Sequence, residues 1–187
     1  MIPHRRPLIT ALAAVASLVA GSEARAQLSI EVRGAAAVGA YEVTGAGLQT
    51  VPGPAFGATL GYAVRPTVEV FAGYSRATFG CDEGFCAGVE PTFTSAGAEA
   101  GARVELPARL WVRGGLALQS LAVDAENADD SSDAALGVKV GAGFAFPLGR
   151  RISITPGFDY TRFTTNLDGG DDGVGVLTGG VGLRLRF

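Results

Sequence analysis

Histidine chemistry is nearly absent from this 187-residue chain. The single histidine, His4, lies in an N-terminal segment with the features of a cleaved signal peptide. Ser–His hydrolases and zinc sites built on imidazole both need this residue. We therefore expect no catalytic, metal or cofactor site and no enzyme. The remaining enzymatic alternative is a carboxylate-only hydrolase using Asp124, Asp130 or Asp171, and no pattern brings such a pair together.

The two cysteines, Cys81 and Cys86, stand close together around Asp82-Glu83-Gly84-Phe85. In an exported chain, two neighbouring cysteines favour a disulfide, and so short an enclosed loop gives a modest stabilisation of about 2 kcal/mol or less. A redox-active pair is the alternative, although the CxxC spacing typical of that chemistry is absent. We predict a disulfide between Cys81 and Cys86.

Acidic residues gather in four polar segments between the apolar stretches. Carboxylates suit Ca²⁺ or Mg²⁺, either of which could bridge anionic lipid headgroups. The run from Asp168 to Gly173 has some likeness to a calcium loop, but it lacks the full ligand spacing and the terminal Glu. Solvated loops are the simpler interpretation, and divalent cations remain candidate partners. The residues are Glu42, Asp82, Glu83, Glu90, Asp124, Glu126, Asp129, Asp130, Asp133, Asp168, Asp171 and Asp172.

A second set of charges occupies alternate positions within the apolar stretches, opposite the bulky side chains. If these charges face an enclosed space, they must pair and hydrogen-bond. We predict a salt-bridge network that fills a lumen; the functional alternative is a gate or a narrow ion path. The network residues are Glu31, Arg33, Glu69, Glu99, Arg103, Arg113, Lys139, Asp159 and Arg184. Arg151, Arg186 and Trp111 share the same parity, and for Trp111 we expect packing or interfacial anchoring.

The N-terminal segment and the composition set the broad class. Arg5 and Arg6 precede an apolar run from Leu8 to Ala20, and Ala24-Arg25-Ala26 supplies a small-x-small cleavage site. We therefore divide the chain into a signal peptide, residues 1–26, and one domain, residues 27–187. Hydrophobic residues make up 48% and charged residues 18%, and the net charge is −3 with no basic tract. This composition excludes a disordered chain and gives no sign of nucleic-acid binding.

Eight stretches alternate bulky apolar residues with small or charged ones, which is the period of a β-strand. Long polar segments near 39–53, 80–90, 124–133 and 164–173 alternate with short connections at 65–66, 106–108 and 147–150. This alternation of lengths is typical of an up-and-down barrel with two unlike rims. The predicted strands are 28–33, 56–64, 68–75, 95–104, 110–119, 136–146, 151–160 and 180–187.

The orientation of the two faces decides the class of barrel. One face carries Leu, Val, Phe and Tyr, as in Leu183 and Leu185, and the other carries Gly, Ala and isolated charges, as in Arg184. The interior of an eight-stranded barrel is narrow, so the small and charged face suits the inside. The bulky face then suits lipid. We predict a closed eight-stranded antiparallel up-and-down transmembrane β-barrel, with a soluble periplasmic ligand-binding barrel as the alternative.

The signal peptide, the eight strands, the unequal loops and the terminal run Val181-x-Leu183-x-Leu185-x-Phe187 resemble the small outer-membrane β-barrels of the OmpA/OmpX type. This resemblance implies a location in the bacterial outer membrane, and we expect a monomer surrounded by outer-membrane lipids. It also implies that the barrel-assembly machinery reads the C-terminal aromatic residue, Phe187, as an assembly signal. We expect a structural or surface-interaction role carried by acidic extracellular loops; a narrow pore for ions or small solutes is the alternative.

Overall fold

The computed structural model describes residues 28–42, 50–81, 92–125, 128–167 and 170–187. The predicted signal peptide, residues 1–26, lies outside these ranges. No helix in the described part of the chain is long and apolar enough to cross a membrane.

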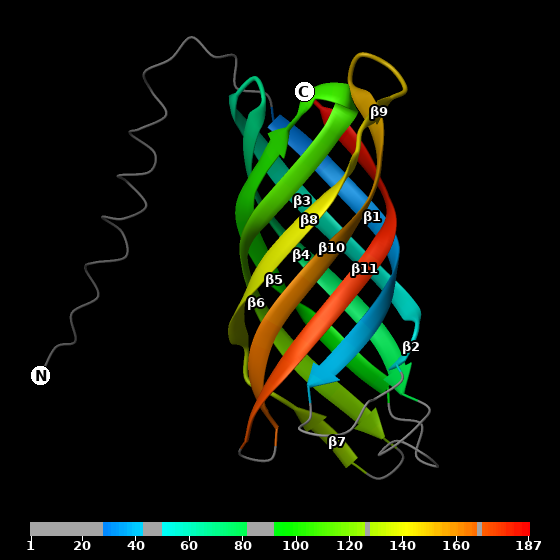
Figure 1. Ribbon diagram of the computed structural model, residues 1–187, viewed down its shortest axis with the longest axis vertical. Helices are drawn as coiled ribbons and strands as arrows, with labels where there is room; N and C mark the ends of the chain where they lie inside the picture. The colour runs from blue at the N-terminus through cyan, green and yellow to red at the C-terminus, as the bar shows by residue number, and fades with distance from the viewer. Residues whose placement is uncertain (1–27, 43–49, 82–91, 126–127, 168–169) are drawn as a thin grey trace, which may run out of the picture.

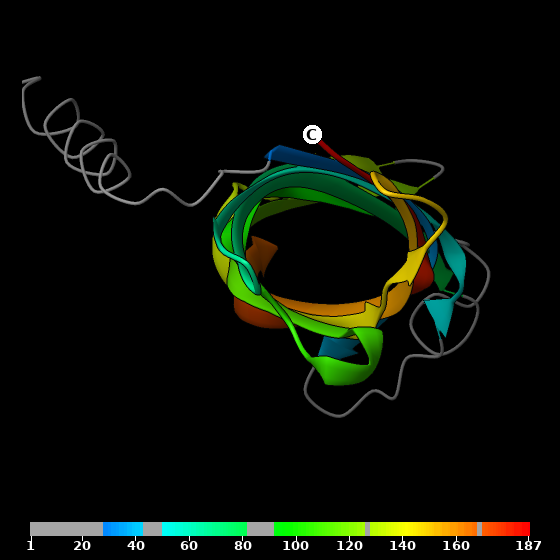
Figure 2. The same ribbon diagram turned by 90° about the horizontal axis from the view of Figure 1, so that it is seen from above.

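Within those ranges, eight long antiparallel strands form one closed sheet (Figures 1 and 2). Each long strand pairs with the next along the chain, and the last, β11, pairs with the first, β1. The predicted fold class is therefore confirmed. The long strands are β1 (Leu28–Glu42), β3 (Gly53–Arg65), β4 (Val68–Cys81), β5 (Thr92–Glu105), β6 (Leu110–Ala125), β8 (Ala135–Phe144), β10 (Ile152–Leu167) and β11 (Gly170–Arg186).

Short elements lie at the two ends of the barrel. β2 (Thr50–Val51) pairs with β4, β7 (Ala128–Ser131) pairs with β6, and β9 (Phe146–Pro147) pairs with β10. A 3₁₀ turn, η2 (Pro107–Arg109), joins β5 to β6. We call the end that holds η2, β9 and Phe187 the short-turn rim, and the opposite end the long-loop rim (Figure 1).

The seam between the first and last strands closes the sheet. Ser29 of β1 lies opposite Arg186 of β11, and the pairing continues to Glu42 opposite Gly173. Because neighbouring residues in register point to the same face, Val32 and Leu183 meet on one side of the seam and Glu31 and Arg184 on the other. The side-chain alternation of both strands is thus matched across the seam.

The apolar face of every long strand points outward. Leu183 and Val138 are each 56% exposed, whereas Arg184 is 2% and Lys139 is 6% exposed. A closed sheet leaves no unpaired strand edge, and an apolar outer belt is what a hydrocarbon environment requires. The open centre of the ribbon ring in Figure 2 is filled by the inward side chains.

Two of the segments expected to be long loops are instead strand. β10 and β11 continue their ladder until Leu167 lies opposite Gly170, so a long loop at 164–173 is wrong. β7 likewise folds back on β6 inside the expected loop 124–133. In both hairpins the backbone pairing continues past the residues whose types alternate between apolar and polar. The strand pattern is therefore visible in the sequence only across the belt.

Candidate functional site

The nine predicted network residues all point into the lumen and are all buried. They come from seven of the eight long strands, because each occupies an inward position in the strand alternation. β3 contributes none; its inward positions hold small residues and Thr59. The nine are Glu31, Arg33, Glu69, Glu99, Arg103, Arg113, Lys139, Asp159 and Arg184.

Five of these residues form one continuous chain of ion pairs across the lumen. Asp159 accepts hydrogen bonds from Nε and Nη2 of Arg113 at 2.6 and 2.5 Å, and from Nη1 of Arg33 at 3.2 Å. The other amino group of Arg33 donates to Oε1 of Glu31 at 2.8 Å, and Arg103 donates to Oε2 of the same carboxylate at 2.7 Å. Each carboxylate is thus shared by two guanidinium groups, which compensates for its removal from water.

Two further clusters complete the charged layer. Lys139 pairs with Glu99, which also accepts a hydrogen bond from Ser75 at 3.1 Å. Arg184 pairs with Glu69, and the hydroxyl of Ser29 donates to the same Glu69 carboxylate at 2.8 Å. In each cluster the hydroxyl and the cation therefore share one carboxylate oxygen, Oε2.

Glu105 is a network residue that the sequence reasoning missed. Its carboxylate accepts a hydrogen bond from Nη1 of Arg184 at 2.8 Å and also pairs with Arg186. Glu105 shares the inward parity of Arg103, and this parity could have identified it. It directly precedes the turn predicted at Leu106 and so lies just outside the predicted strand 95–104. Arg151, which was expected on the inner face, is instead exposed beside the turn that precedes β10.

Trp111 lies at the centre of the arginine cluster and is fully buried. The guanidinium carbons of Arg103, Arg33 and Arg113 lie 4.6, 5.0 and 5.6 Å from the indole ring. The indole N–H donates to the carbonyl of Phe144 at 3.0 Å. The ring face thus attracts the cations by a cation–π interaction, and the hydrogen bond fixes the ring orientation.

Two glycines make room for this indole. A Cβ at Gly143 or Gly157 would lie 2.6 or 2.5 Å from Cζ2 of Trp111, which is closer than any real contact. Gly143 and Gly157 pair directly with each other across β8 and β10. Both the indole and the backbone of the paired strand therefore require glycine at these inward positions.

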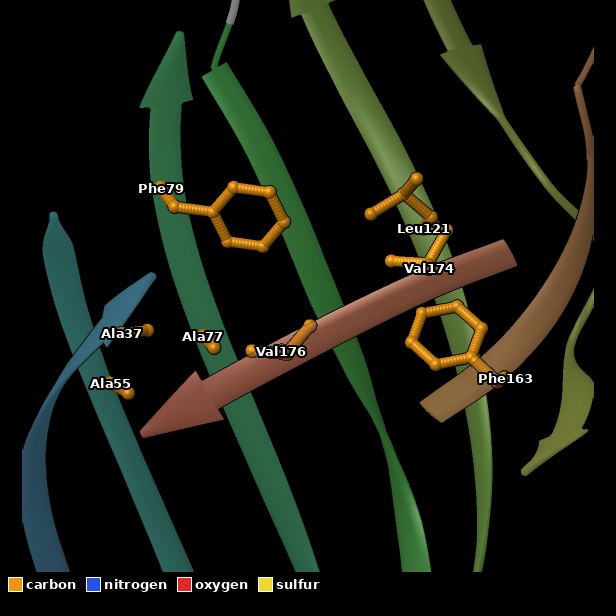
Figure 3. Packing of buried hydrophobic residues seen from close by; sticks show 8 residues of the cluster. All are labelled: Ala37, Ala55, Ala77, Phe79, Leu121, Phe163, Val174 and Val176. Carbon is orange, nitrogen blue, oxygen red and sulfur yellow. The ribbon is translucent and has the colours of Figure 1, made fainter. Parts of the chain in front are cut away.

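A second, apolar layer crosses the lumen nearer the long-loop rim (Figure 3). Figure 3 shows Phe79, Leu121 and Phe163 projecting into the barrel from three different strands, close to Val174 and Val176. Ala37, Ala55 and Ala77 complete this layer, and Phe79 stacks on Phe93 with a centroid distance of 5.7 Å. This apolar layer was not predicted, although the parity of Phe79, Leu121 and Phe163 within their strands indicates it.

Between the two layers lies a cavity of about 50 Å³. Its lining includes Glu99, Arg113, Lys139 and Asp159 from the charged layer and Val176 from the apolar layer. A volume of this size holds a few water molecules at most. Among the described residues, no group of three or more His, Cys, Asp or Glu side chains could hold a metal ion.

Several predicted sites fall partly or wholly outside the described residues. Cys81 is the last residue of β4, and Cys86 lies outside the described ranges, so the disulfide stays a prediction. Of the acidic segments, the exposed side chains of Asp124 and Asp133 are described at the long-loop rim. Phe187 is exposed at the opposite rim, where its N–H donates to the carbonyl of Leu28 at 2.8 Å.

Comparison with known proteins places these features in context. A family model described as "Outer membrane protein beta-barrel domain" matches residues 10–187. No curated protein matches the sequence at a significant level.

Solved structures with a similar fold include three small bacterial barrels. Neisserial surface protein A (NspA) gives a TM-score of 0.64 at 17% identity, covering 86% of this chain and 97% of NspA. Ail, the attachment invasion locus protein of Yersinia pestis, in complex with the heparin analogue sucrose octasulfate, gives 0.56 at 18% identity, covering 86% and 99%. OprG from Pseudomonas aeruginosa gives 0.50 at 14% identity, covering 85% and 95%. At these identities the likeness concerns the fold alone.

Proposed function

Because this chain belongs to the outer membrane protein β-barrel domain family, we propose that it is a non-conducting barrel of the bacterial outer membrane that acts through its long-loop rim. The membership implies the outer membrane as its location. The barrel then serves as a rigid anchor in the lipid, and the acidic segments beyond the belt form the functional surface. No catalytic step is part of this proposal.

The observation that carries the proposal is the double closure of the lumen. The ion-paired layer around Trp111 and Asp159 and the apolar layer around Phe79, Leu121 and Phe163 occupy successive levels along the barrel, since Phe163 follows Asp159 along the inner face of β10. A hydrated ion would have to break buried ion pairs in the first layer and cross dry apolar side chains in the second. Both steps are costly, since unpaired buried charges and ions in apolar surroundings are strongly disfavoured.

Recording from planar bilayers tests the closed lumen. We expect the purified, reconstituted barrel to give no stable unitary currents, while a porin inserted into the same bilayer conducts. Stable unitary currents that disappear in Glu99→Gln or Lys139→Gln would contradict the proposal. That outcome would establish the alternative function, a narrow pore gated by the charged layer.

The sign of the charges favours cationic partners at the long-loop rim. Ail, which shares the fold, is in complex with a sulfated heparin analogue, a polyanion. In this chain the four polar segments are rich in Asp and Glu, and like charges would repel such a polyanion. Divalent cations that bridge these carboxylates to anionic lipid headgroups are the partner that this chemistry supports.

Neutralising acidic residues at this rim tests that role. We expect the wild-type barrel to associate with lipopolysaccharide vesicles in the presence of Ca²⁺ and to be released by a chelator. A variant with Asp129, Asp130, Asp168, Asp171 and Asp172 changed to asparagine should lose most of this association, because carboxylates supply the calcium ligands. Gel mobility before and after boiling verifies that the variant is folded. Unchanged calcium-dependent association would count against the proposed partner.

A further inference from the structure

The short-turn rim holds a second pocket, of about 230 Å³, at the opposite end of the barrel from Asp124 and Asp133. It lies between the η2 turn, the turn from β9 to β10 and the end of β11. Four arginines line it, namely Arg109, Arg150, Arg151 and Arg186, and the lining contains a single carboxylate, Glu105. A pocket of this volume is large enough for a phosphate group with several waters.

Within the described residues, most of the positive charge of this pocket has no paired carboxylate. Glu105 is already shared by Arg184 and Arg186. Arg109, Arg150 and Arg151 are exposed and make no ion pair within the described part of the chain. Guanidinium groups held around one pocket repel one another unless an anion lies between them, and they bind phosphate oxygens in a planar, bidentate geometry.

The backbone holds the walls of this pocket in place. Ala108 and Arg109 adopt left-handed conformations, with φ values of 61° and 63°, which non-glycine residues rarely do. The carbonyl of Arg109 accepts a hydrogen bond from the N–H of Ala145 at 2.8 Å, which ties the η2 turn to the neighbouring turn. The carbonyl of Arg151 accepts another from the N–H of Arg186 at 2.8 Å. Strained backbone retained by such bonds is a recurrent feature of ligand sites.

The lipid-facing surface ends at the same place. Ile152 lines the pocket and is exposed on the outer face, and Leu148 is exposed in the adjoining turn. Just below, Phe144 and Phe146 stack on the outer surface with a centroid distance of 6.2 Å. Aromatic side chains at a barrel rim mark the level of the lipid headgroups. A ligand with both a phosphate and acyl chains would therefore meet the arginines and the apolar belt together.

From this arrangement we propose that the pocket binds a phosphate group, supplied by the headgroup of an anionic phospholipid in the periplasmic leaflet. The short turns of such barrels face the periplasm, which places the arginines at that leaflet. Basic pockets at a membrane interface bind anionic headgroups by this chemistry. The inference goes beyond the proposed function and does not depend on the closed lumen or on the acidic segments.

A charge-matched pair of variants tests the pocket. Arg150→Gln/Arg151→Gln removes two pocket charges, and Arg65→Gln/Arg76→Gln removes two exposed arginines that do not line it. Each folded protein in neutral detergent is titrated calorimetrically with a soluble short-chain phosphatidylglycerol and, separately, with inorganic phosphate. At about 1 kcal/mol for each arginine, the pocket variant should bind phosphatidylglycerol roughly 30-fold more weakly than wild type. The control variant should bind like wild type.

The two titrations distinguish the sources of the phosphate. Selective weakening in the pocket variant, with inorganic phosphate bound far less tightly than the lipid, supports a headgroup site. Equally tight binding of inorganic phosphate, with the same selective weakening, supports the phosphate site and identifies a soluble phosphate as its ligand. The absence of binding to either probe, or equal weakening in the two variants, would overturn the proposal. Neither of these last two results would bear on the conductance of the lumen.

Discussion

Replacing Asp159 with asparagine is expected to lower the free energy of unfolding of the barrel by roughly 3 to 5 kcal/mol. Asp159 is 1% exposed and accepts hydrogen bonds from both Arg113 and Arg33. Neutralising Asp159 removes the negative charge that pairs with these two buried guanidinium groups. Removing one partner of a buried ion pair is strongly destabilising, because the other charge stays buried without its partner. Urea titration followed by the fluorescence of Trp111, the only tryptophan, measures the change.

Two further variants show whether the pair itself is responsible. Asp124→Asn removes an exposed carboxylate at the long-loop rim and should change the unfolding free energy by less than about 0.5 kcal/mol. The double variant Asp159→Asn/Arg113→Gln should lose less than the sum of the two single variants, because the second substitution removes a charge that the first left unpaired. Strictly additive losses would argue against a coupled pair.

Replacing Trp111 with alanine is the second change with a large expected effect, a loss of roughly 3 to 5 kcal/mol. The indole is fully buried, three guanidinium groups lie against it, and the absence of side chains at Gly143 and Gly157 leaves space for it. Truncation opens a void that these glycines cannot fill. Because the variant has no tryptophan fluorescence, the shift in gel mobility between folded and unfolded protein during a urea titration is the appropriate measurement.

The conservative variant Trp111→Phe separates packing from hydrogen bonding. Phenylalanine keeps an aromatic face for Arg103 and Arg33 but loses the indole N–H that donates to Phe144. We expect a smaller loss, of about 1 kcal/mol from the hydrogen bond together with the cost of the smaller ring. Leu148→Ala, in an exposed turn, serves as a control and should change stability little. A tolerated Trp111→Ala would mean that the charged layer holds its geometry without the ring.

The barrel and its inside–outside orientation could be predicted because large side chains alternate clearly in strands such as β11, where Leu183 and Arg184 point to opposite faces. The length of β1 could not be predicted, since its second half is rich in Gly and Ala and shows no alternation of large and small side chains. Hydrogen bonding to β11 carries β1 on to Glu42. A period of two in the sequence therefore predicts strands only where the two faces meet different surroundings.

The partners within the lumen were beyond prediction for a different reason. Arg33 meets Asp159 although β11 lies between their strands, and Arg103 meets Glu31 across two intervening strands. Such meetings depend on how far the strands are staggered around the barrel, and single-strand periodicity contains no information on stagger. The parity of a residue predicts that it faces inward, and the three-dimensional register alone decides which other residue it meets.

The seam between β1 and β11 has a consequence for how the molecule is made. The strand synthesised first can complete its hydrogen bonds only with the strand synthesised last. Until then both edges of the growing sheet stay open, and open edges recruit other chains. Contacts between such distant parts of a chain also make folding slow. Ring closure is thus a late event, and a nascent chain that lacks its final strand is expected to need a chaperone to avoid aggregation.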